Sequence, residues 1–436
     1  MEILISVIVI LALMFLGCRV FASFLVGSLV YIFMTGTGQA TVGPLVLNAI
    51  SSSSLLAVPL YMLAGGLMEV SGIAGDLVDF ANHLLKKVKY GVGATIPLAC
   101  MFFGAICGSG LATVSALGNI MVPKLEKLGY DRRYVAAMLT AACPLGYMIP
   151  PNMNAIIFGV VANVSIAGLF SATIIPGIIW GVLLIVLNRF MAPKWVTEVT
   201  SEDAMKYGAE AESYWGGLRS SFFRAFPAIL LAVIILGGIY GGIFTPTEAG
   251  AVGCLYAILT GLFYYKKLKR KETFQEFIKA GKSLGSIFII FPMVALFSRF
   301  LILKNVPQIV VTLFTSVSEN PYVILLLLGI MLLIAGMFFD ANILMLVLTP
   351  MIMPTCNYIG LDPLQLGVIM MVAVGIGAST PPMAMHLFVA CRVANTDINE
   401  TVKPLIPMLL LACLPIMLLV MYVPVLSLWL PGLLMG

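Results

Sequence analysis

Two stretches of the sequence break in the same way: GYMIPPN at residues 146–152 and GASTPPM at residues 377–383. Each places a glycine four residues before a pair of prolines, inside an otherwise apolar run. Proline removes a backbone hydrogen bond and clashes with the preceding helical turn, so each pair interrupts a helix. The sequence therefore predicts two broken helices at corresponding places in the chain.

The two breaks belong to an internal repeat, and such a repeat indicates a fold built from two related units. Six glycine, proline and aspartate positions recur at one offset (354 − 123 = 231): Pro123 with Pro354, Gly129 with Gly360, Asp131 with Asp362, Gly146 with Gly377, Pro150 with Pro381, and Pro151 with Pro382. Just downstream, Val-Ala-Asn at 161–163 returns at 393–395, an offset of 232. Interrupted apolar segments in corresponding halves of a chain are typical of the binding site of a secondary transporter.

The composition is that of a membrane protein. The chain has 436 residues, of which 61% are hydrophobic and 10% charged, and its mean hydropathy is +1.09. A soluble domain has about 25% charged residues. A span needs about 20 apolar residues, which leaves room for roughly ten to twelve spans. We expect an all-α polytopic membrane protein in which residues 3–34 form the first membrane element.

The positive charges are clustered beside the apolar runs. The net charge is +5, and the clusters are KKVK at 86–89, Arg132 with Arg133, and KKLKRK at 266–271. Such clusters mark the cytoplasmic ends of spans and contact membrane lipid, so no nucleic-acid partner is expected. The eight cysteines form no CxxC pair and lie in apolar runs, which predicts small buried side chains rather than disulfides or a zinc site.

A polar stretch at 191–221 divides the chain into two repeats, 1–190 and 222–436. Each repeat is expected to contain scaffold helices and one unit, at 104–159 and at 335–390, made of a re-entrant hairpin and a broken helix. The hairpin tips are predicted at GSG (108–110) and near Asp340.

The breaks have a chemical use. Non-helical backbone at membrane depth is tolerated only where it is buried in protein or lines a watery cavity. Freed carbonyls coordinate a small hard cation, and half-helix N-termini attract anions. The sequence therefore predicts cation sites beside an anion site. The alternative is that the prolines and glycines only kink membrane helices.

The residues that an intramembrane enzyme needs are missing from the sequence. The two histidines, His83 and His386, do not form an HExxH motif, and no Walker lysine loop is present. Asp340 has Ser109 as its repeat counterpart, so the repeat supplies no pair of catalytic acids. We expect a transporter that is not an enzyme and has no cofactor.

Five stretches that together cover nearly the whole chain carry a resemblance to a known family. They are LLAVPLYMLAGGLMEVSGI (55–73), GSGLATVSALGNIMVPKLEKLGYDRRYVAAM (108–138), IPPN to IIFG (149–159), TPTEAGAVG (245–253) and GMFFDAN to HLFVA (336–390). In these stretches, and in their order, the chain resembles the large membrane subunit (DctM type) of a TRAP, or tripartite ATP-independent periplasmic, transporter.

The resemblance implies an inverted repeat with a scaffold and an elevator-type transport domain in the bacterial inner membrane. It also implies sodium-driven uptake of a small organic acid: a dicarboxylate, sialic acid, or another sugar or keto acid. Two partners are implied, a periplasmic substrate-binding protein and a small four-helix membrane subunit. Because family motifs begin by residue 55, that subunit is expected to be a separate chain. The alternative is an ion-coupled organic anion carrier that needs no binding protein.

Candidate site residues follow from the resemblance and from the spacing. One sodium ion is expected among Gly336, Gly377, Thr380 and Met383, and a second among Ser109, Gly146, Ile149 and Asn152. The substrate is expected to contact Ser109, Asn152, Asn154 and Asp340.

Four further expectations concern other residues. Gly104, Ala105, Gly108 and Ala112 would allow the first hairpin to slide. Thr245 and Glu248 form a capping box with Pro246 at the first helical position. Glu69, Asp76 and Asp79 are expected to form interfacial ion pairs. The roles of Arg299 and Arg392 stay open, between contact with a substrate carboxylate and a position at the membrane interface, and His386 is expected only to fill a polar seam on a helix face.

Overall fold

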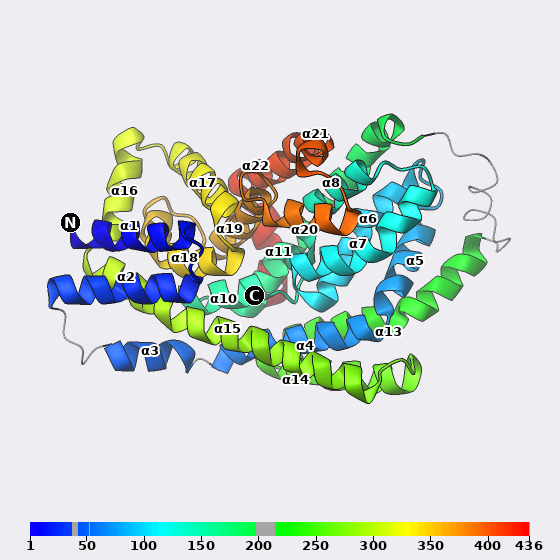
Figure 1. Cartoon of the computed structure of the whole chain (residues 1–436), viewed down its shortest axis with the longest axis horizontal. Coiled ribbons are helices and arrows are strands. Elements are labelled where there is room, and N and C mark those ends of the chain that lie inside the picture. The colour runs from blue at the N-terminus through cyan, green and yellow to red at the C-terminus, as the bar shows by residue number, and fades with distance from the viewer. Residues whose placement is uncertain (37–41, 52, 198–213, 436) are drawn as a thin grey trace.

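The structure, a computed structural model, describes residues 1–36, 42–51, 53–197 and 214–435. Over these ranges the chain is helical, and the one β contact is an isolated bridge between Tyr130 and Val196. An all-α membrane fold is confirmed (Figure 1).

The described helices before the polar stretch are α1 (Glu2–Phe15), α2 (Val20–Thr35), α3 (Val42–Ile50), η2 (Ser53–Leu56), α4 (Ala57–Val70), α5 (Ile73–Leu85), α6 (Gly91–Cys107), α7 (Gly110–Lys127), α8 (Arg132–Ala142), α9 (Leu145–Met148), α10 (Met153–Ala162), α11 (Ile166–Met191) and η3 (Ala192–Lys194).

The described helices after it are α13 (Tyr214–Tyr240), α14 (Pro246–Leu259), η4 (Thr260–Tyr264), α15 (Arg270–Leu303), α16 (Val306–Val317), α17 (Pro321–Phe338), α18 (Ala341–Tyr358), α19 (Pro363–Ala378), α20 (Met385–Ala394), α21 (Ile398–Met408), η5 (Leu409–Cys413), α22 (Leu414–Tyr422) and α23 (Val425–Met435). The predicted linker at 191–221 is shorter than expected, since α11 continues to Met191 and α13 begins at Tyr214; residues 198–213 lie outside the described ranges.

The repeat is visible in the helix boundaries. Helices α7 and α18 both have 18 residues, and α10 and α20 both have 10. Helices α8 and α19 begin after Asp131 and Asp362, whose carboxylates each accept a hydrogen bond from the backbone N–H two residues on. Both hairpin tips and both helix breaks therefore lie where the sequence predicts them. Only the first repeat is interrupted again, at Pro144, where the second has Gly375.

The two repeats interlock. Hairpin helix α7 packs against α20 and α8 packs against α20, while hairpin helix α18 packs against α10. In Figure 1 these helices occupy the middle of the molecule, and α4, α13, α14 and α15 run along its lower edge. Each hairpin thus contacts the broken helix of the other repeat.

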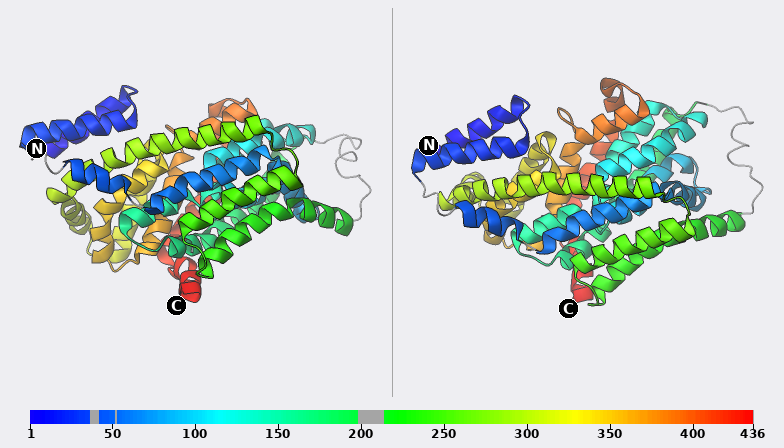
Figure 2. Two further views of the ribbon diagram at one scale, coloured as in Figure 1. Left: turned by 90° about the horizontal axis from the view of Figure 1, so that it is seen from below. Right: turned by 60° about the horizontal axis from the view of Figure 1, so that its bottom comes forward.

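Two expectations about the spans are wrong. Residues 3–34 form two helices, α1 and α2, because the chain turns at Gly17 (φ +82°); Figure 2 shows them as an antiparallel pair at one end of the molecule. Seven described helices are long and apolar enough to cross a membrane, or nine if each bent pair counts as one span, rather than ten to twelve. The difference arises because breaks divide much of the apolar sequence into helices of 10–17 residues.

The basic clusters lie at one end of the helices, on the right of Figure 1. The Lys87 ammonium lies 4.2 Å from the centroid of the Tyr214 ring. Nearby, Lys124 and Asp79 form an ion pair of 3.2 Å. Arg224 bridges Asp76 and Asp79 at 4.0 Å each, so the expected ion pairing of these two acids is confirmed. The positive-inside rule predicts that this end faces the cytoplasm.

Candidate functional site

The first hairpin tip fits tightly against the first helix break. Gly108 has φ +61°, and Ser109 is extended and accepts a hydrogen bond from the Ala112 N–H (3.5 Å). A Cβ atom at Gly108 would lie 2.7 Å from the Pro151 carbonyl oxygen. The tip therefore needs glycine both for its left-handed backbone and for its close approach to the break.

Two glycines of this hairpin lie against its own repeat. A Cβ at Gly104 would lie 2.7 Å from the Gly146 Cα, within the same repeat. Helix α4 also contacts the hairpin closely, since a Cβ at Gly65 would lie 2.8 Å from the Cys107 Cα. Gly104 and Gly108 thus hold the hairpin against its own broken helix.

The second repeat has the same kind of backbone crossing. A Cβ at Gly336 would lie 2.8 Å from the Val374 carbonyl oxygen, and one at Gly377 would lie 2.7 Å from the Gly336 Cα. The C-terminal turns of α17 and α19 therefore meet without side chains between them, as the ends of α6 and α9 do at Gly104 and Gly146. The last carbonyls of a helix have no intrahelical partner, so each crossing gathers carbonyl oxygens.

A cavity of about 70 Å³ lies between the two hairpin tips. Apart from Gly108, the residues that line it form six pairs at offsets of 231 or 232: Ser109 with Asp340, Gly110 with Ala341, Leu111 with Asn342, Tyr147 with Ala378, Met153 with Met385, and Asn154 with His386. The cavity therefore lies on the approximate symmetry axis that relates the two repeats.

The polar side chains of the cavity differ between its halves. The carboxylate of Asp340 accepts hydrogen bonds from the backbone N–H of Asn342 (2.9 Å) and from its amide nitrogen (2.8 Å). His386 is buried, and its Nδ1 lies 2.9 Å from the Ser379 hydroxyl. No lysine or arginine lines the cavity. An anionic substrate would therefore be bound by N–H and O–H donors rather than by a cationic side chain.

Three of the four expected substrate residues, Ser109, Asn154 and Asp340, line this cavity. The fourth, Asn152, does not; it is fully buried, and its Oδ1 accepts a hydrogen bond from the Ala155 N–H (2.7 Å). This asparagine caps α10, so its amide oxygen is already engaged.

The expected sodium ligands lie at the helix breaks and in the hairpins, with Gly336 in α17 and Ser109 at the start of α7. Thr380 donates its hydroxyl hydrogen to the Ile376 carbonyl (2.7 Å), and its own N–H bonds the Gly377 carbonyl (2.8 Å). The side chain of Met383 is half exposed, so only its backbone is available as a ligand. Ile149 is extended where α9 ends, which turns its carbonyl out of the helix.

Sequence reasoning missed Thr113, Tyr147 and Asn342, and gave His386 no role. Thr113 is fully buried, and its hydroxyl oxygen lies 2.6 Å from the position of a Cβ at Gly146. The repeat offset was a sufficient signal for His386, which is 232 positions after Asn154. Arg299 and Arg392 are exposed and do not line the cavity.

The capping box and the cysteines follow the sequence prediction. The Thr245 hydroxyl accepts from the Glu248 N–H, and the Glu248 carboxylate accepts from the Thr245 N–H (2.8 Å). All eight cysteines are free, and seven of them are buried.

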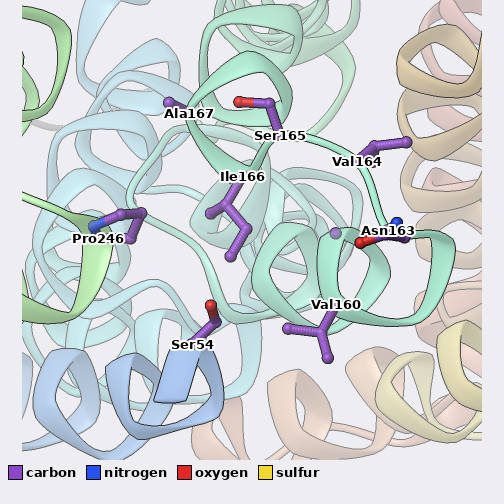
Figure 3. Close-up of a pocket in the computed structure, with 9 residues that line it drawn as sticks. Ser54, Val160, Asn163, Val164, Ser165, Ile166, Ala167 and Pro246 are labelled. Carbon is purple, nitrogen blue, oxygen red and sulfur yellow. The ribbon is translucent and has the colours of Figure 1, made fainter. Parts of the chain in front are cut away.

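A second cavity, of about 340 Å³, lies where α10 turns into α11 (Figure 3). The turn from Gly159 to Ala167 forms one wall, and Ser54 and Pro246 lie on the other side. Its lining contains no ionisable side chain. It lies at the end of α11 and α14 opposite the basic clusters, and its polar side chains are those of Ser54, Asn163 and Ser165.

Two hairpins and two broken helices around one cavity define the class of secondary transporters built from inverted repeats. The chain belongs to the DctM family: the family model for "Tripartite ATP-independent periplasmic transporter, DctM component" matches residues 7–426.

Three curated relatives agree with this. The chain is 34% identical over 381 residues to the C4-dicarboxylate TRAP transporter large permease protein DctM of Pseudomonas aeruginosa, covering 87% of this chain and 86% of that one. It is 32% identical to the isethionate permease DctMQ of Oleidesulfovibrio alaskensis, over 90% of this chain and 60% of that protein. It is 34% identical to the sialic acid permease SiaT of Haemophilus influenzae, over 93% of this chain and 64% of that protein. The relatives are transporter permeases, so the chain is a transporter rather than an enzyme.

Two solved structures share the fold. One is the YdaH transporter of Alcanivorax borkumensis, with a TM-score of 0.57 and 16% identity over 87% of this chain and 86% of that one. The other is MtrF of Neisseria gonorrhoeae, with a TM-score of 0.56 and 15% identity over 90% of this chain and 83% of that one.

Proposed function

We propose that this large permease subunit catalyses sodium-coupled uptake of a small organic acid, delivered by a periplasmic binding protein, across the bacterial inner membrane. The observation that carries the proposal is the cavity between the hairpin tips, which is lined by corresponding residues of both repeats and contains the Asp340 carboxylate. The two close backbone contacts, Gly104 with Gly146 and Gly336 with Gly377, belong to the same hairpins and broken helices.

Sodium suits the crossings because it is a hard cation that prefers oxygen ligands. The crossing at Gly336 and Gly377 offers carbonyls together with the Thr380 hydroxyl. The crossing at Gly104 and Gly146 adds Thr113, whose hydroxyl donates to the Ser109 carbonyl (2.7 Å). Among the described residues no three His, Cys, Asp or Glu side chains group together, so these sites do not resemble those of transition metals.

An organic acid suits the cavity because four half-helix N-termini, those of α7, α10, α18 and α20, meet around it. Helix N-termini carry partial positive charge and free N–H groups, which favour carboxylates. The relatives are named as permeases for C4-dicarboxylates, isethionate and sialic acid, and each of these substrates is an organic acid.

An elevator movement is the transport mechanism that we propose. The two hairpins and the two broken helices pack on one another, which supports their movement as one body. The larger cavity lies between the turn from α10 to α11 and the residues Ser54 and Pro246, near the starts of α4 and α14, so the packing there leaves an open space. One body that moves against a scaffold is a common form of alternating access.

We propose a small membrane subunit as a separate partner chain. The isethionate relative is named DctMQ, and this chain spans 60% of its length. The hydrophobic outer faces of α13 and α14, with Val233 and Leu255 exposed, would pack against lipid or against such a partner.

The test is uptake by the chain reconstituted in vesicles with a small membrane subunit and a binding protein encoded beside it. We expect a sodium gradient, and not a proton gradient, to drive accumulation of an organic acid that the binding protein holds. Uptake driven by a pH gradient without sodium would refute sodium coupling. Full uptake without the binding protein would favour the independent carrier, and transport restricted to neutral sugars would refute the organic-acid assignment.

A further inference from the structure

The start of helix α20 differs from the other three helix starts at the cavity. Helices α7, α18 and α10 are each capped by their own side chain, from Ser109, Asp340 and Asn152 respectively. The N-cap of α20 is Ala384, which has no side chain that could accept a hydrogen bond. The first-turn residues Met385 and His386 line the cavity. The N–H groups of this turn are therefore free to bind an anion in the cavity.

A buried histidine provides a second, independent indication at the same place. His386 is 6% exposed, and its Nδ1 lies 2.9 Å from the Ser379 hydroxyl. That hydroxyl also lies 3.0 Å from the Gly375 carbonyl and 3.2 Å from the Thr140 carbonyl. Because a hydroxyl has a single hydrogen, donation to a carbonyl leaves its oxygen to accept from Nδ1–H. The second ring nitrogen, Nε2, then presents a lone pair and has no partner among the described residues.

Other groups at the cavity also lack partners. The amide nitrogen of Asn342 donates to Asp340, which leaves its Oδ1 buried and without a hydrogen bond in the described structure. The buried Tyr147 hydroxyl has no partner there either, and its ring centroid lies 6.1 Å from that of His386. Buried polar groups are normally paired, so groups left unpaired around a cavity point to a bound molecule that completes them.

We propose that His386 and the uncapped start of α20 form the carboxylate end of the substrate site, and that the substrate is a hydroxylated carboxylic acid. The carboxylate receives hydrogen bonds from the first-turn N–H groups of α20. A neighbouring hydroxyl of the substrate donates to His386 Nε2, and further hydroxyls donate to Asn342 Oδ1 and to the Asp340 carboxylate. A second carboxylate would instead meet these acceptors and be repelled. This inference rests on the proposed function of the cavity.

Two variants of His386 separate a substrate contact from a structural role. His386→Asn places an amide where Nδ1 lies, so it keeps the bond to Ser379 and removes the group at Nε2. It also installs the residue that the other repeat has at this position, Asn154. His386→Gln reaches the position of Nε2 and gives up the bond to Ser379. If His386 has only a structural role, the Asn variant should lose less ligand affinity than the Gln variant. If His386 contacts the substrate, the Gln variant should lose less affinity than the Asn variant.

The experiment measures ligand-induced shifts in Tm on the purified full chain with its small membrane partner, in saturating sodium and without binding protein. The probes are gluconate and adipate, six-carbon acids with and without hydroxyl groups. We expect gluconate, and not adipate, to raise Tm. We expect the apparent Kd for gluconate to rise roughly tenfold or more in His386→Asn and by less than about threefold in His386→Gln.

The inference is overturned if adipate binds better than gluconate, if neither acid shifts Tm, or if His386→Asn binds like the wild type. It is also overturned if the Gln variant loses as much affinity as the Asn variant. Sodium-driven uptake by the wild-type complex is measured in parallel. If wild-type uptake is intact and the substitutions of His386 do not change gluconate binding, only this inference fails. If the wild-type complex takes up no organic acid, the proposed function fails.

Discussion

Ser109 and Asp340, 231 positions apart, occupy the same place in the two repeats: each caps the second helix of its hairpin, and both line one cavity. Both positions keep a helix cap, but the caps differ: Ser109 accepts from the N–H three residues on, and Asp340 accepts from the N–H two residues on. A hydroxyl faces the cavity in one half and a carboxylate in the other. Corresponding positions with different caps give the repeated scaffold an asymmetric site, as a substrate with two unlike ends requires.

The carboxylate of Asp340 is expected to act in transport and not in folding. Asp340→Asn keeps an oxygen that can accept from the Asn342 N–H, so the cap is retained, while the charge is lost. We expect sodium-driven uptake to fall at least about tenfold with Tm close to the wild type. Asp362→Asn is the matched control, because Asp362 caps α19 outside the cavity and its variant should transport normally. Equal uptake by both variants would contradict a role for the charge.

Ser109 and Ser165 offer a second matched pair. Both cap a helix by accepting from the N–H three residues on, at 3.5 Å and 3.1 Å. Removing either cap by substitution with alanine costs about 1 kcal/mol of stability. Only Ser109 lines the cavity between the hairpins, so only Ser109→Ala should also raise the KM for uptake. Thermal unfolding and uptake kinetics of the two variants check this, and a similar KM in both would remove Ser109 from the site.

The helix breaks and hairpin tips could be predicted from sequence because they depend on local chemistry. The two proline pairs interrupt helices wherever they lie, and the Gly-Ser-Gly tip needs no tertiary information. The constant offset then predicts that Ser109 and Asp340 share a role. Asn154 and Asp340 were placed in the site by resemblance and by the repeat, and both line the cavity.

The remaining features depend on packing between segments that are distant in sequence. The stretch 3–34 is mostly apolar, and its length alone suggested one membrane element; the signal for its division was Gly17 followed closely by Arg19, the residue that precedes α2. Tyr147 looked like a helix residue next to a break, and only the contact between repeats brings it beside His386. Asn152 was expected at the substrate because it follows the proline pair, but its side chain caps α10 and is buried.

The glycine crossing of the second repeat is expected to be essential for sodium binding. A Cβ at Gly377 would collide with the Leu333 carbonyl and lie 2.7 Å from Gly336 Cα, so Gly377→Ala must separate α17 from α19. Overpacking of this kind costs about 1–3 kcal/mol. We expect a lower Tm and a weaker sodium dependence of uptake. Gly285→Ala is the control, because nothing lies within 4 Å of its Cβ position. An unchanged sodium dependence in Gly377→Ala would exclude this crossing as the ion site.

The cytoplasmic start of α8 is expected to show a defined pH dependence. Hydrogen bonds from Arg133 hold the pKa of the Asp131 carboxyl below its usual value of 3.8. A depressed folded-state pKa stabilises the folded protein above the unfolded value, and this stabilisation is lost as the pH falls through 3.8 towards the folded pKa. Arg133→Met should therefore be less stable than the wild type at pH 7, with a difference that shrinks below about pH 4. Thermal unfolding between pH 3 and 7 measures this, and a difference that stays constant over that range would exclude the linkage.

The contact between α4 and the first hairpin offers a direct test of relative motion. A Cβ at Gly65 would lie 3.5 Å from the native Cys107 Cβ, at the short end of the 3.5–4.5 Å range for a disulfide. The same Cβ would lie 2.8 Å from the Cys107 Cα, so α4 and the hairpin must separate slightly to admit the new side chain. We expect Gly65→Cys, after that shift, to cross-link to Cys107 under mild oxidation. If the hairpin moves with the transport body against α4, the cross-linked protein should lose most of its uptake, and a reductant should restore it.

The same oxidation applied to Gly65→Cys with Cys107→Ala controls for damage elsewhere, since the other seven cysteines are retained. This control should transport equally with and without oxidant. The decisive measurement is the uptake of a sample in which the cross-link is complete, as judged by the loss of free thiol at both positions. If such a sample transports at the rate of the reduced protein, the first hairpin does not move relative to α4, and the elevator mechanism is wrong for this protein.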